Sequence, residues 1–122
     1  MRKKRVLIVD DDPRNIFALS ATLRAKSFDC ISCTSAEEAL RILKTDELID
    51  AVLIDMMMPE MDGYEAIPLI KKIESRAEVP VVSVTAQAMV GDREKCLLAG
   101  ADDYISKPID VDKLLNVLRK IE

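Results

Sequence analysis

Residues 51–59 read AVLIDMMMP, in which the uninterrupted apolar run AVLI at 51–54 ends at the carboxylate of Asp55. A short run that is apolar on both of its alternating faces is typical of a central parallel strand covered by helices on both sides. Two other segments have the same character, VLIV at 6–9 and VVSV at 81–84. With two further segments that alternate polar and apolar residues, they give five predicted strands: Arg5–Val9, Phe28–Cys33, Ala51–Ile54, Val81–Val84 and Asp103–Ser106.

Helix signals follow the first two strands. Asp12 is placed to cap a helix that has Pro13 at its first position. Ser35 and Glu38 have the spacing of a capping box ahead of a second helix. The chain therefore alternates strand and helix from its first strand onward.

Similar signals predict three later helices. One is expected over Tyr64–Glu74, where Pro68 falls in the opening turns and is a residue able to kink the helix. The next should end at Gly100, a natural left-handed C-cap. Asp110 is expected to cap the last helix, whose apolar stripe consists of Val111, Leu114, Leu115, Leu118 and Ile121.

Five successive strand–helix units predict an α/β fold, a doubly wound (βα)5 three-layer sandwich of the flavodoxin-like type. The five-stranded parallel sheet is expected to have the order 2-1-3-4-5, because this order puts the two alternating strands at the edges. No linker, repeat or low-complexity segment interrupts the pattern. Residues 1–122 are therefore expected to form one domain, with no output domain in this chain.

The composition excludes several function classes. A net charge of −4 and an aromatic content of 3% give no reason to expect nucleic-acid binding. The absence of histidine excludes the usual zinc sites and Ser-His-Asp triads on this chain. The longest early apolar run, VLIV, is too short for a signal peptide or a membrane span. We therefore expect a cytoplasmic protein with no membrane contact.

Cys30 and Cys33 spell a C-x-x-C motif. A redox dithiol normally lies at a helix start. Here the motif falls in a predicted strand, where residues three apart point to opposite faces of the sheet. We interpret both cysteines as reduced packing residues.

Polar side chains follow four of the predicted strands. Asp10 and Asp11 come after the first strand, Asp55 after the third, Thr85 after the fourth and Lys107 after the fifth. In doubly wound sheets, ligands bind beyond the carboxyl ends of the strands, where the strand order reverses. We therefore expect these five side chains to meet at one edge of the sheet.

Three carboxylates at short range repel one another unless a cation lies between them. Asp12 is interpreted as a helix cap, whereas Asp10, Asp11 and Asp55 are better explained by a bound metal. Oxygen ligands without histidine or cysteine favour Mg²⁺ or Mn²⁺ over zinc. Thr85 and Lys107 suit phosphoryl oxygens, so the pattern resembles a phosphoryl-transfer centre with a carboxylate nucleophile.

Four stretches are informative together: LIVDDDP at 7–13, LIDMMMPEMDG at 53–63, VTAQA at 84–88 and AGADDYISKP at 99–108. Through these stretches, and over essentially its whole length, the sequence resembles the receiver domains of two-component response regulators, including the single-domain chemotaxis regulators.

The resemblance implies a role for each matching residue. Asp55 is the phosphoacceptor, and Asp10 and Asp11 hold the metal together with the backbone carbonyl of Met57. Thr85 and Lys107 bind the phosphoryl group, Tyr104 is the aromatic switch residue, and the Lys107–Pro108 bond is cis. Met56 and Met58 are expected to pack instead.

The resemblance also implies a mechanism and partners. A histidine kinase or phosphotransfer protein donates a phosphoryl group to Asp55 in a Mg²⁺-dependent transfer. Thr85 then moves towards the phosphate, Tyr104 turns inward, and the surface of the fourth helix, fifth strand and fifth helix changes. A downstream effector, or a second copy through the fourth and fifth helices, would read this change. The chain is expected to be a phosphoacceptor that assists its own phosphorylation and dephosphorylation, not an enzyme.

Two residues are expected to tune the lifetime of the phosphorylated state. Gln87 is suited to orient a hydrolytic water, while the apolar side chain of Met57 is suited to hinder one. Slow to intermediate loss of phosphate is expected.

Two alternative functions remain open. A haloacid-dehalogenase-type phosphatase also has a D-x-D after its first strand, which Asp10 to Asp12 contain, but Pro13 and Arg14 replace the threonine or valine expected next. A phosphorylation-independent adaptor would keep the fold without the chemistry. The complete set of carboxylates, threonine and lysine argues against the adaptor.

Overall fold

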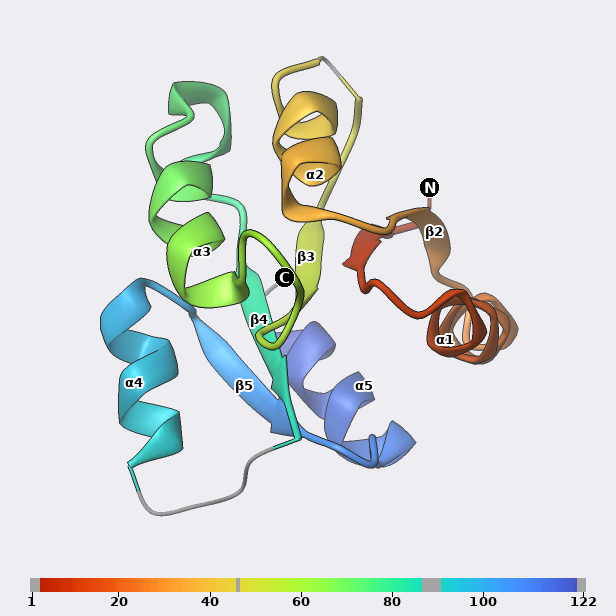
Figure 1. The fold of residues 1–122 in the computed structure, drawn as a ribbon. Helices are drawn as coiled ribbons and strands as arrows, with labels where there is room; N and C mark the ends of the chain where they lie inside the picture. The colour runs from red at the N-terminus through yellow and green to blue at the C-terminus, as the bar shows by residue number, and fades with distance from the viewer. Residues whose placement is uncertain (1–2, 46, 87–90, 121–122) are drawn as a thin grey trace.

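The computed structural model describes residues 3–45, 47–86 and 91–120, in which strands and helices alternate along the chain (Figure 1). In chain order the elements are β1 (Arg5–Val9), α1 (Pro13–Ala25), β2 (Asp29–Cys33), α2 (Ala36–Leu43), β3 (Ala51–Asp55), α3 (Gly63–Lys71), the 3₁₀ helix η1 (Glu74–Arg76), β4 (Val81–Thr85), α4 (Asp92–Ala99), β5 (Asp103–Ser106) and α5 (Val111–Lys120). None of the described helices combines the length and the hydropathy needed to cross a membrane.

The five strands form one parallel sheet in the order β2-β1-β3-β4-β5, as predicted. β3 and β4 are buried along their whole length, because helices cover both faces of the sheet. β2 and β5 lie at the edges, and both contain partly exposed positions. The alternation of polar and apolar residues in these two strands therefore identified the edges correctly.

Two hydrophobic clusters lie on opposite faces of the sheet. Leu7 and Val52 belong to the cluster covered by α2, α3 and α4, whereas Ile8 and Leu53 belong to the cluster covered by α1 and α5. Figure 1 shows the same division of the helices around the sheet. The molecule is thus a three-layer sandwich, and consecutive residues of each strand supply alternate layers.

The C-x-x-C cysteines follow this alternation. Cys30 packs in the cluster on the α1 and α5 side, and Cys33 packs in the opposite cluster. Both are buried free thiols, as is Cys96. The interpretation of Cys30 and Cys33 as packing residues is confirmed.

The predicted caps are present. Asp12 accepts a hydrogen bond from the Arg14 N–H, and Ser35 Oγ accepts one from the Glu38 N–H at 3.2 Å. The Glu38 carboxylate accepts from the N–H of Thr34 at 3.1 Å, so the capping box closes one residue before its usual place. Gly100 ends α4 at φ 113°, and Asp110 Oδ1 accepts from the Asp112 N–H at 2.9 Å.

Some element boundaries differ from the prediction. β2 begins at Asp29 because the N–H of Phe28 bonds the Leu23 carbonyl at the end of α1. β3 and β4 each extend one residue further, to Asp55 and Thr85. Ile121, the last residue of the predicted apolar stripe, lies outside the described residues.

The third helix was predicted over Tyr64–Glu74, but α3 spans Gly63–Lys71 and Glu74 belongs to η1. α3 starts earlier because Asp62 caps it by accepting from the Glu65 N–H at 3.0 Å. It ends earlier because the chain changes to i→i+3 bonds. The N–H of Ile73 bonds the Ile70 carbonyl at 3.0 Å, and the N–H of Arg76 bonds the Ile73 carbonyl at 2.8 Å.

Candidate functional site

Three carboxylates lie together at the carboxyl end of the sheet. Asp10 and Asp11 follow β1, and Asp55 ends β3. One oxygen from each lies within 4.8 Å of the others. Asp10 and Asp55 are each only 6% exposed, whereas Asp11 is exposed. The structure brings these three predicted residues into one cluster.

The parallel pairing of β1 and β3 explains this convergence. Val9 pairs with Ile54, so the residues that follow them, Asp10 and Asp55, emerge at the same level of the sheet. The Asp10 N–H bonds the Cys33 carbonyl of β2 at 3.2 Å, which keeps its backbone in line with the strand. The carboxylates of Asp10 and Asp55 are therefore positioned by the backbone ladder of the sheet.

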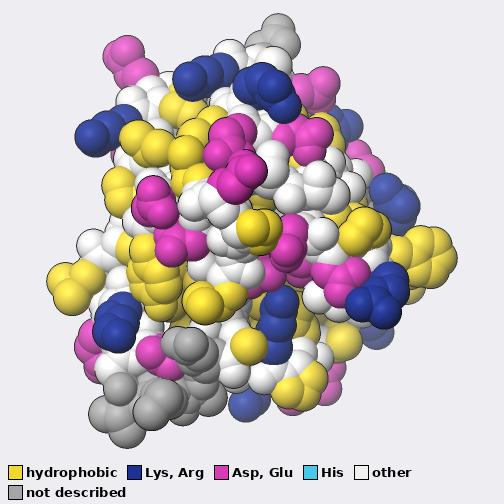
Figure 2. All heavy atoms as spheres, in the orientation of Figure 1, with side chains coloured by type: hydrophobic (Ala, Val, Ile, Leu, Met, Phe, Trp, Pro, Cys, Tyr) yellow, Lys and Arg dark blue, Asp and Glu magenta, His cyan; other side chains and the backbone are white. Residues whose placement is uncertain are grey.

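Lys107 joins the cluster from the segment after β5. Its Nζ lies 3.2 Å from Oδ2 of Asp55 and 3.8 Å from Oδ2 of Asp10. Its backbone N–H donates to the Thr85 carbonyl at 2.7 Å, which ties it to the end of β4. The predicted cis peptide bond between Lys107 and Pro108 is present. Figure 2 shows acidic side chains near the middle of one face of the molecule, with a basic group beside them.

The charge of the cluster suits a hard divalent cation. When ionised, three carboxylates and one ammonium group leave a formal charge of −3 + 1 = −2. Burial raises the pKa of Asp10, and the Asp12 N–H and Lys107 only partly oppose this shift, while Asp55 adds to it. Carboxylate oxygens are the ligands that Mg²⁺ prefers. These residues therefore fit the predicted metal, and the acidic cluster is able to bind one.

The segment after β3 supports Asp55. The N–H of Met57 donates to Oδ1 of Asp55 at 3.0 Å, while the Met57 side chain is 54% exposed. Met56 and Met58 are buried in the cluster on the α2, α3 and α4 side, as predicted. Gly63, at the start of α3, leaves no room for a side chain, because an added Cβ would lie 2.9 Å from the Met56 Cα. This close approach fixes the path of the chain around the carboxylate.

The remaining predicted residues lie on β4 and β5 or beyond them. Thr85 ends β4 and is 1% exposed. Tyr104, on β5, is partly buried and packs against the cluster on the α2, α3 and α4 side. Gln87 lies outside the described residues.

Asn15 is a neighbour of the site that was not predicted. Its Nδ2 lies 3.5 Å from Oδ2 of Asp10, and it comes from the first turn of α1. An amide donor three residues after the cap residue Asp12 was the available sequence signal.

A pocket of about 280 Å³ adjoins the site between α1 and α5. Asp10, Asn15, Asp55 and Lys107 line its polar end, and most of the other lining side chains, such as Leu19 and Ile109, are apolar. The phosphoacceptor candidate is thus accessible from this side.

Residues 6–119 match the family described as the response regulator receiver domain. The chain belongs to that family. Receiver domains are the phosphoacceptor signalling switches of two-component systems, and this chain is one of them. The family and the fold expected from the sequence are both confirmed.

Two curated relatives illustrate the match. The receiver is 39% identical over 113 residues to the signal transduction histidine-protein kinase BarA of Escherichia coli K12. The matched segment covers 93% of this chain and 12% of the kinase. It is 38% identical over 109 residues to the heme response regulator HssR of Staphylococcus saprophyticus. Here the matched segment covers 89% of this chain and 47% of the regulator. The chain therefore spans less than half the length of either relative.

Solved structures agree with the fold. A putative response regulator from Chloroflexus aurantiacus has a TM-score of 0.92 and 29% identity, with 98% of each chain covered. The receiver domain of the sensor histidine kinase PA1611 from Pseudomonas aeruginosa PAO1 has a TM-score of 0.87 and 34% identity, with 97% of this chain and 96% of that chain covered. The PA1611 domain holds a magnesium ion in its active site cleft.

Proposed function

We propose that Asp55 is the phosphoacceptor of this receiver and takes its phosphoryl group from a phosphohistidine. The observation that carries the proposal is the setting of the Asp55 carboxylate. It is 6% exposed, with one oxygen on the Met57 N–H at 3.0 Å and the other on Lys107 Nζ at 3.2 Å. A carboxylate held in this way is oriented for nucleophilic attack.

In the transfer, a carboxylate oxygen of Asp55 forms a bond to phosphorus as the P–N bond of the donor breaks. The donor imidazole keeps the electron pair of that bond. Lys107 is placed to neutralise charge on the phosphoryl oxygens, and the Thr85 hydroxyl binds another of them. The product is an acylphosphate, which carries roughly two negative charges.

Asp10, Asp11 and Asp55 would hold a Mg²⁺ ion, with the backbone carbonyl of Met57 as a further ligand. Mn²⁺ suits the same oxygen ligands. The bound ion supplies neutralisation of the negative charge that gathers during phosphoryl transfer. The side chain of Met57 does not enter this role, because a backbone carbonyl is the ligand.

Phosphorylation is proposed to change the outer surface through Thr85 and Tyr104. Thr85 moves towards the phosphoryl group, and Tyr104 turns inward into the space released. The surface formed by α4, β5 and α5 then presents a different face to a downstream effector or to a second copy of the receiver.

The proposed partners are a histidine kinase or phosphotransfer protein as donor, with neither nucleic acid nor membrane bound by residues 1–122. These residues are proposed to act as a single receiver unit in the cytoplasm. The receiver is proposed to be a stoichiometric phosphoacceptor and not a turnover enzyme.

The test is incubation with Mg²⁺ and a small phosphodonor, followed by intact-mass measurement. We expect one added phosphoryl group on the wild type and none on Asp55→Asn. Asp112→Asn, an exposed aspartate on α5, is the matched control and should be modified like the wild type. Omission of Mg²⁺ should slow the modification by at least an order of magnitude.

Two results would contradict the proposal. Continuous release of phosphate that depends on Asp10 but not on Asp55 would indicate a phosphatase of the haloacid-dehalogenase type. No modification with either a small donor or a phosphorylated histidine partner would indicate an adaptor without phosphoryl chemistry.

A further inference from the structure

Ser83 carries a buried polar atom without a partner. It lies in the middle of β4 and is 0% exposed. Among the described residues, its Oγ is a buried side-chain oxygen with no hydrogen bond. Buried hydroxyl groups are normally hydrogen-bonded, because a hydroxyl that has lost water and gained no partner destabilises the state that contains it. The unpaired hydroxyl of Ser83 therefore requires a physical explanation.

The position of Ser83 in the sheet suggests one. Ser83 pairs with Tyr104 of β5, and Thr85 lies two residues further along the same strand. Side chains alternate along a strand, so Ser83 and Thr85 point to the same face. Tyr104 packs on that face, against the cluster covered by α2, α3 and α4. The unpaired hydroxyl thus adjoins both residues proposed to form the switch, Tyr104 on the neighbouring strand and Thr85 on the same strand.

Tyr104 has the length to reach this hydroxyl. Neighbouring strands lie about 4.8 Å apart, which is less than the length of a tyrosine side chain. A ring that turns inward over β4 therefore brings its phenol oxygen near Ser83. The phenol group is both a donor and an acceptor, as is the serine hydroxyl.

We infer that Ser83 is a positioning residue of the switch, whose hydroxyl hydrogen-bonds the phenol of Tyr104 when the ring lies inward. The inference rests on the proposed phosphorylation of Asp55. In the resting state the hydroxyl is unpaired, and in the phosphorylated state it is paired. The difference favours the inward ring and so strengthens the coupling between the phosphoacceptor and the outer surface.

Two substitutions separate this role from a simple packing role. Ser83→Ala removes only Oγ, so the resting state loses no hydrogen bond and should keep or raise its melting temperature. In the phosphorylated state the same substitution removes one hydrogen bond. Tyr104→Phe removes the other partner of that bond, and the double variant should lose no more than either single variant.

Fluorine NMR can follow the ring directly, because the chain has only two tyrosines, Tyr64 and Tyr104. After incorporation of 3-fluorotyrosine, Tyr64→Phe assigns the two signals. Addition of Mg²⁺ and beryllofluoride, which mimics a phosphoryl group on a carboxylate, should shift the Tyr104 signal of the wild type. In Ser83→Ala the signal should return part of the way to its resting position. This corresponds to a fall of about two- to tenfold in the ratio of inward to outward ring, as expected for one hydrogen bond.

Ser20→Ala is the matched control, because Ser20 is another buried serine and lies on α1. It should leave the Tyr104 signal of the activated state unchanged. Thermal shifts on addition of Mg²⁺ and beryllofluoride, measured for the single and double variants, provide the second readout.

Two results would overturn the inference. One is an unchanged Tyr104 signal in activated Ser83→Ala. The other is a fall in the melting temperature of Ser83→Ala that is equal in the resting and activated states. This result would show that the Ser83 Oγ has a hydrogen-bond partner in both states. If the wild type itself fails to respond to Mg²⁺ and beryllofluoride or to accept phosphate, the proposed function fails instead.

Discussion

Met57 is the exposed member of a run of three methionines. Its side chain is 54% exposed beside the Asp55 carboxylate, whereas Met56 and Met58 are buried. Its N–H donates to Asp55. The backbone of this residue therefore supports the carboxylate, while its side chain is free to shield whatever is bound there.

We expect Met57→Asn to shorten the lifetime of the acylphosphate on Asp55. An asparagine amide is able to hold a water by hydrogen bonds, and the apolar methionine is not. The expected acceleration is on the order of tenfold, less than a full general base contributes. Decay of phosphorylated protein, followed by intact-mass measurement, checks this.

Leu48→Asn is the control, because Leu48 is also apolar and is 55% exposed, in the segment before β3. Its decay should match that of the wild type. Equal decay in Met57→Asn and wild type would remove the proposed gating role of Met57.

At the scale of elements, the turn from β3 into α3 depends on one glycine. The Gly63 N–H bonds the Met56 carbonyl at 3.2 Å, and the two backbones approach too closely for a Cβ. Any side chain at position 63 must therefore move the segment that carries Met57.

Gly63→Ala is expected to lower the free energy of unfolding by about 1 to 3 kcal/mol, the usual cost of overpacking a buried site. It should also slow the modification of Asp55, because the Met57 N–H shifts with the loop. Chemical denaturation and intact-mass measurement check the two effects. Glu65→Ala, at an exposed position of the same helix, should change neither property. Unaltered stability in Gly63→Ala would show that the turn relaxes without strain.

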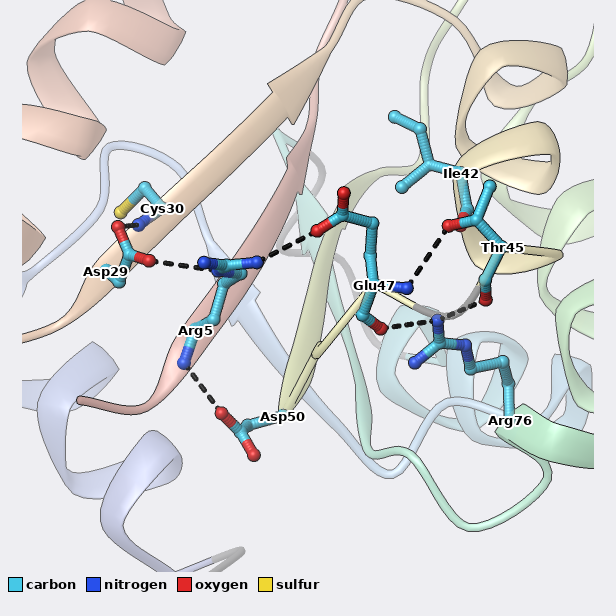
Figure 3. A network of polar contacts seen from close by, with 8 residues as sticks. All are labelled: Arg5, Asp29, Cys30, Ile42, Thr45, Glu47, Asp50 and Arg76. Carbon is cyan, nitrogen blue, oxygen red and sulfur yellow. Dashed lines mark hydrogen bonds and ion pairs between the residues drawn. The ribbon is translucent and has the colours of Figure 1, made fainter. Parts of the chain in front are cut away.

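A network of hydrogen bonds and ion pairs joins several elements at the entry to β3 (Figure 3). Arg76 of η1 is 7% exposed and donates to the carbonyls of Leu43, Thr45 and Glu47 at 2.6 to 2.9 Å. Arg5 of β1 bonds the carboxylates of Asp29 and Glu47 nearby. These contacts close the end of α2 and hold the segment that leads into β3.

Arg76→Met should destabilise the fold by about 3 kcal/mol, because three backbone carbonyls, one buried and two partly buried, lose a charged donor. Modification of Asp55 in the folded protein should continue at the wild-type rate, because the network lies before β3 and the site after it. Denaturation with parallel intact-mass measurement tests both statements. Arg41→Met, at an exposed position of α2, is the control. A loss of modification in folded Arg76→Met would contradict the separation of the two ends of the sheet.

Pro68 lies inside α3 on its exposed side, where its ring removes one helical donor. Nothing in the structure gives it a functional role.

At the scale of the whole molecule, burial between the sheet and its two helix layers determines how readily the cysteine thiols ionise. Cys30, Cys33 and Cys96 are all buried, and desolvation raises the pKa of Cys33 to about 12 from its usual 9.0. The thiolate fraction of Cys33 in the folded protein is therefore about a thousandfold lower than in an unfolded chain at the same pH.

We expect the folded receiver to resist alkylation of Cys33 and to lose stability in alkali. The unfolded thiol ionises near pH 9.0 and the folded thiol only near pH 12. The contribution of the protonated Cys33 thiol to the free energy of unfolding is therefore complete below pH 9 and declines between these two pH values. Iodoacetamide labelling, read by mass with and without denaturant, checks the first statement, and melting temperatures from pH 7 to 10.5 check the second. Cys33→Ala should reduce the alkaline decline, and an unchanged decline would assign it to other groups.

Local sequence patterns determined the strands, most helix caps, the sheet order and the set of polar residues at its carboxyl edge. Each rests on near neighbours in the chain: an apolar run, a cap residue, or a side chain directly after a strand. Because the strands are parallel, their carboxyl ends lie at one edge of the sheet, and the residues that follow them meet there.

Only the tertiary structure decided the contacts between distant segments. The end of α3, the placement of Asn15 beside Asp10, the reach of Arg76 to three carbonyls and the unpaired hydroxyl of Ser83 beside Tyr104 all belong to this class. Each depends on which groups of remote segments meet, and on whether a buried polar atom finds a partner there. Backbone periodicity carries no information on either question, because burial and hydrogen bonding at these positions are set by packing across the sheet.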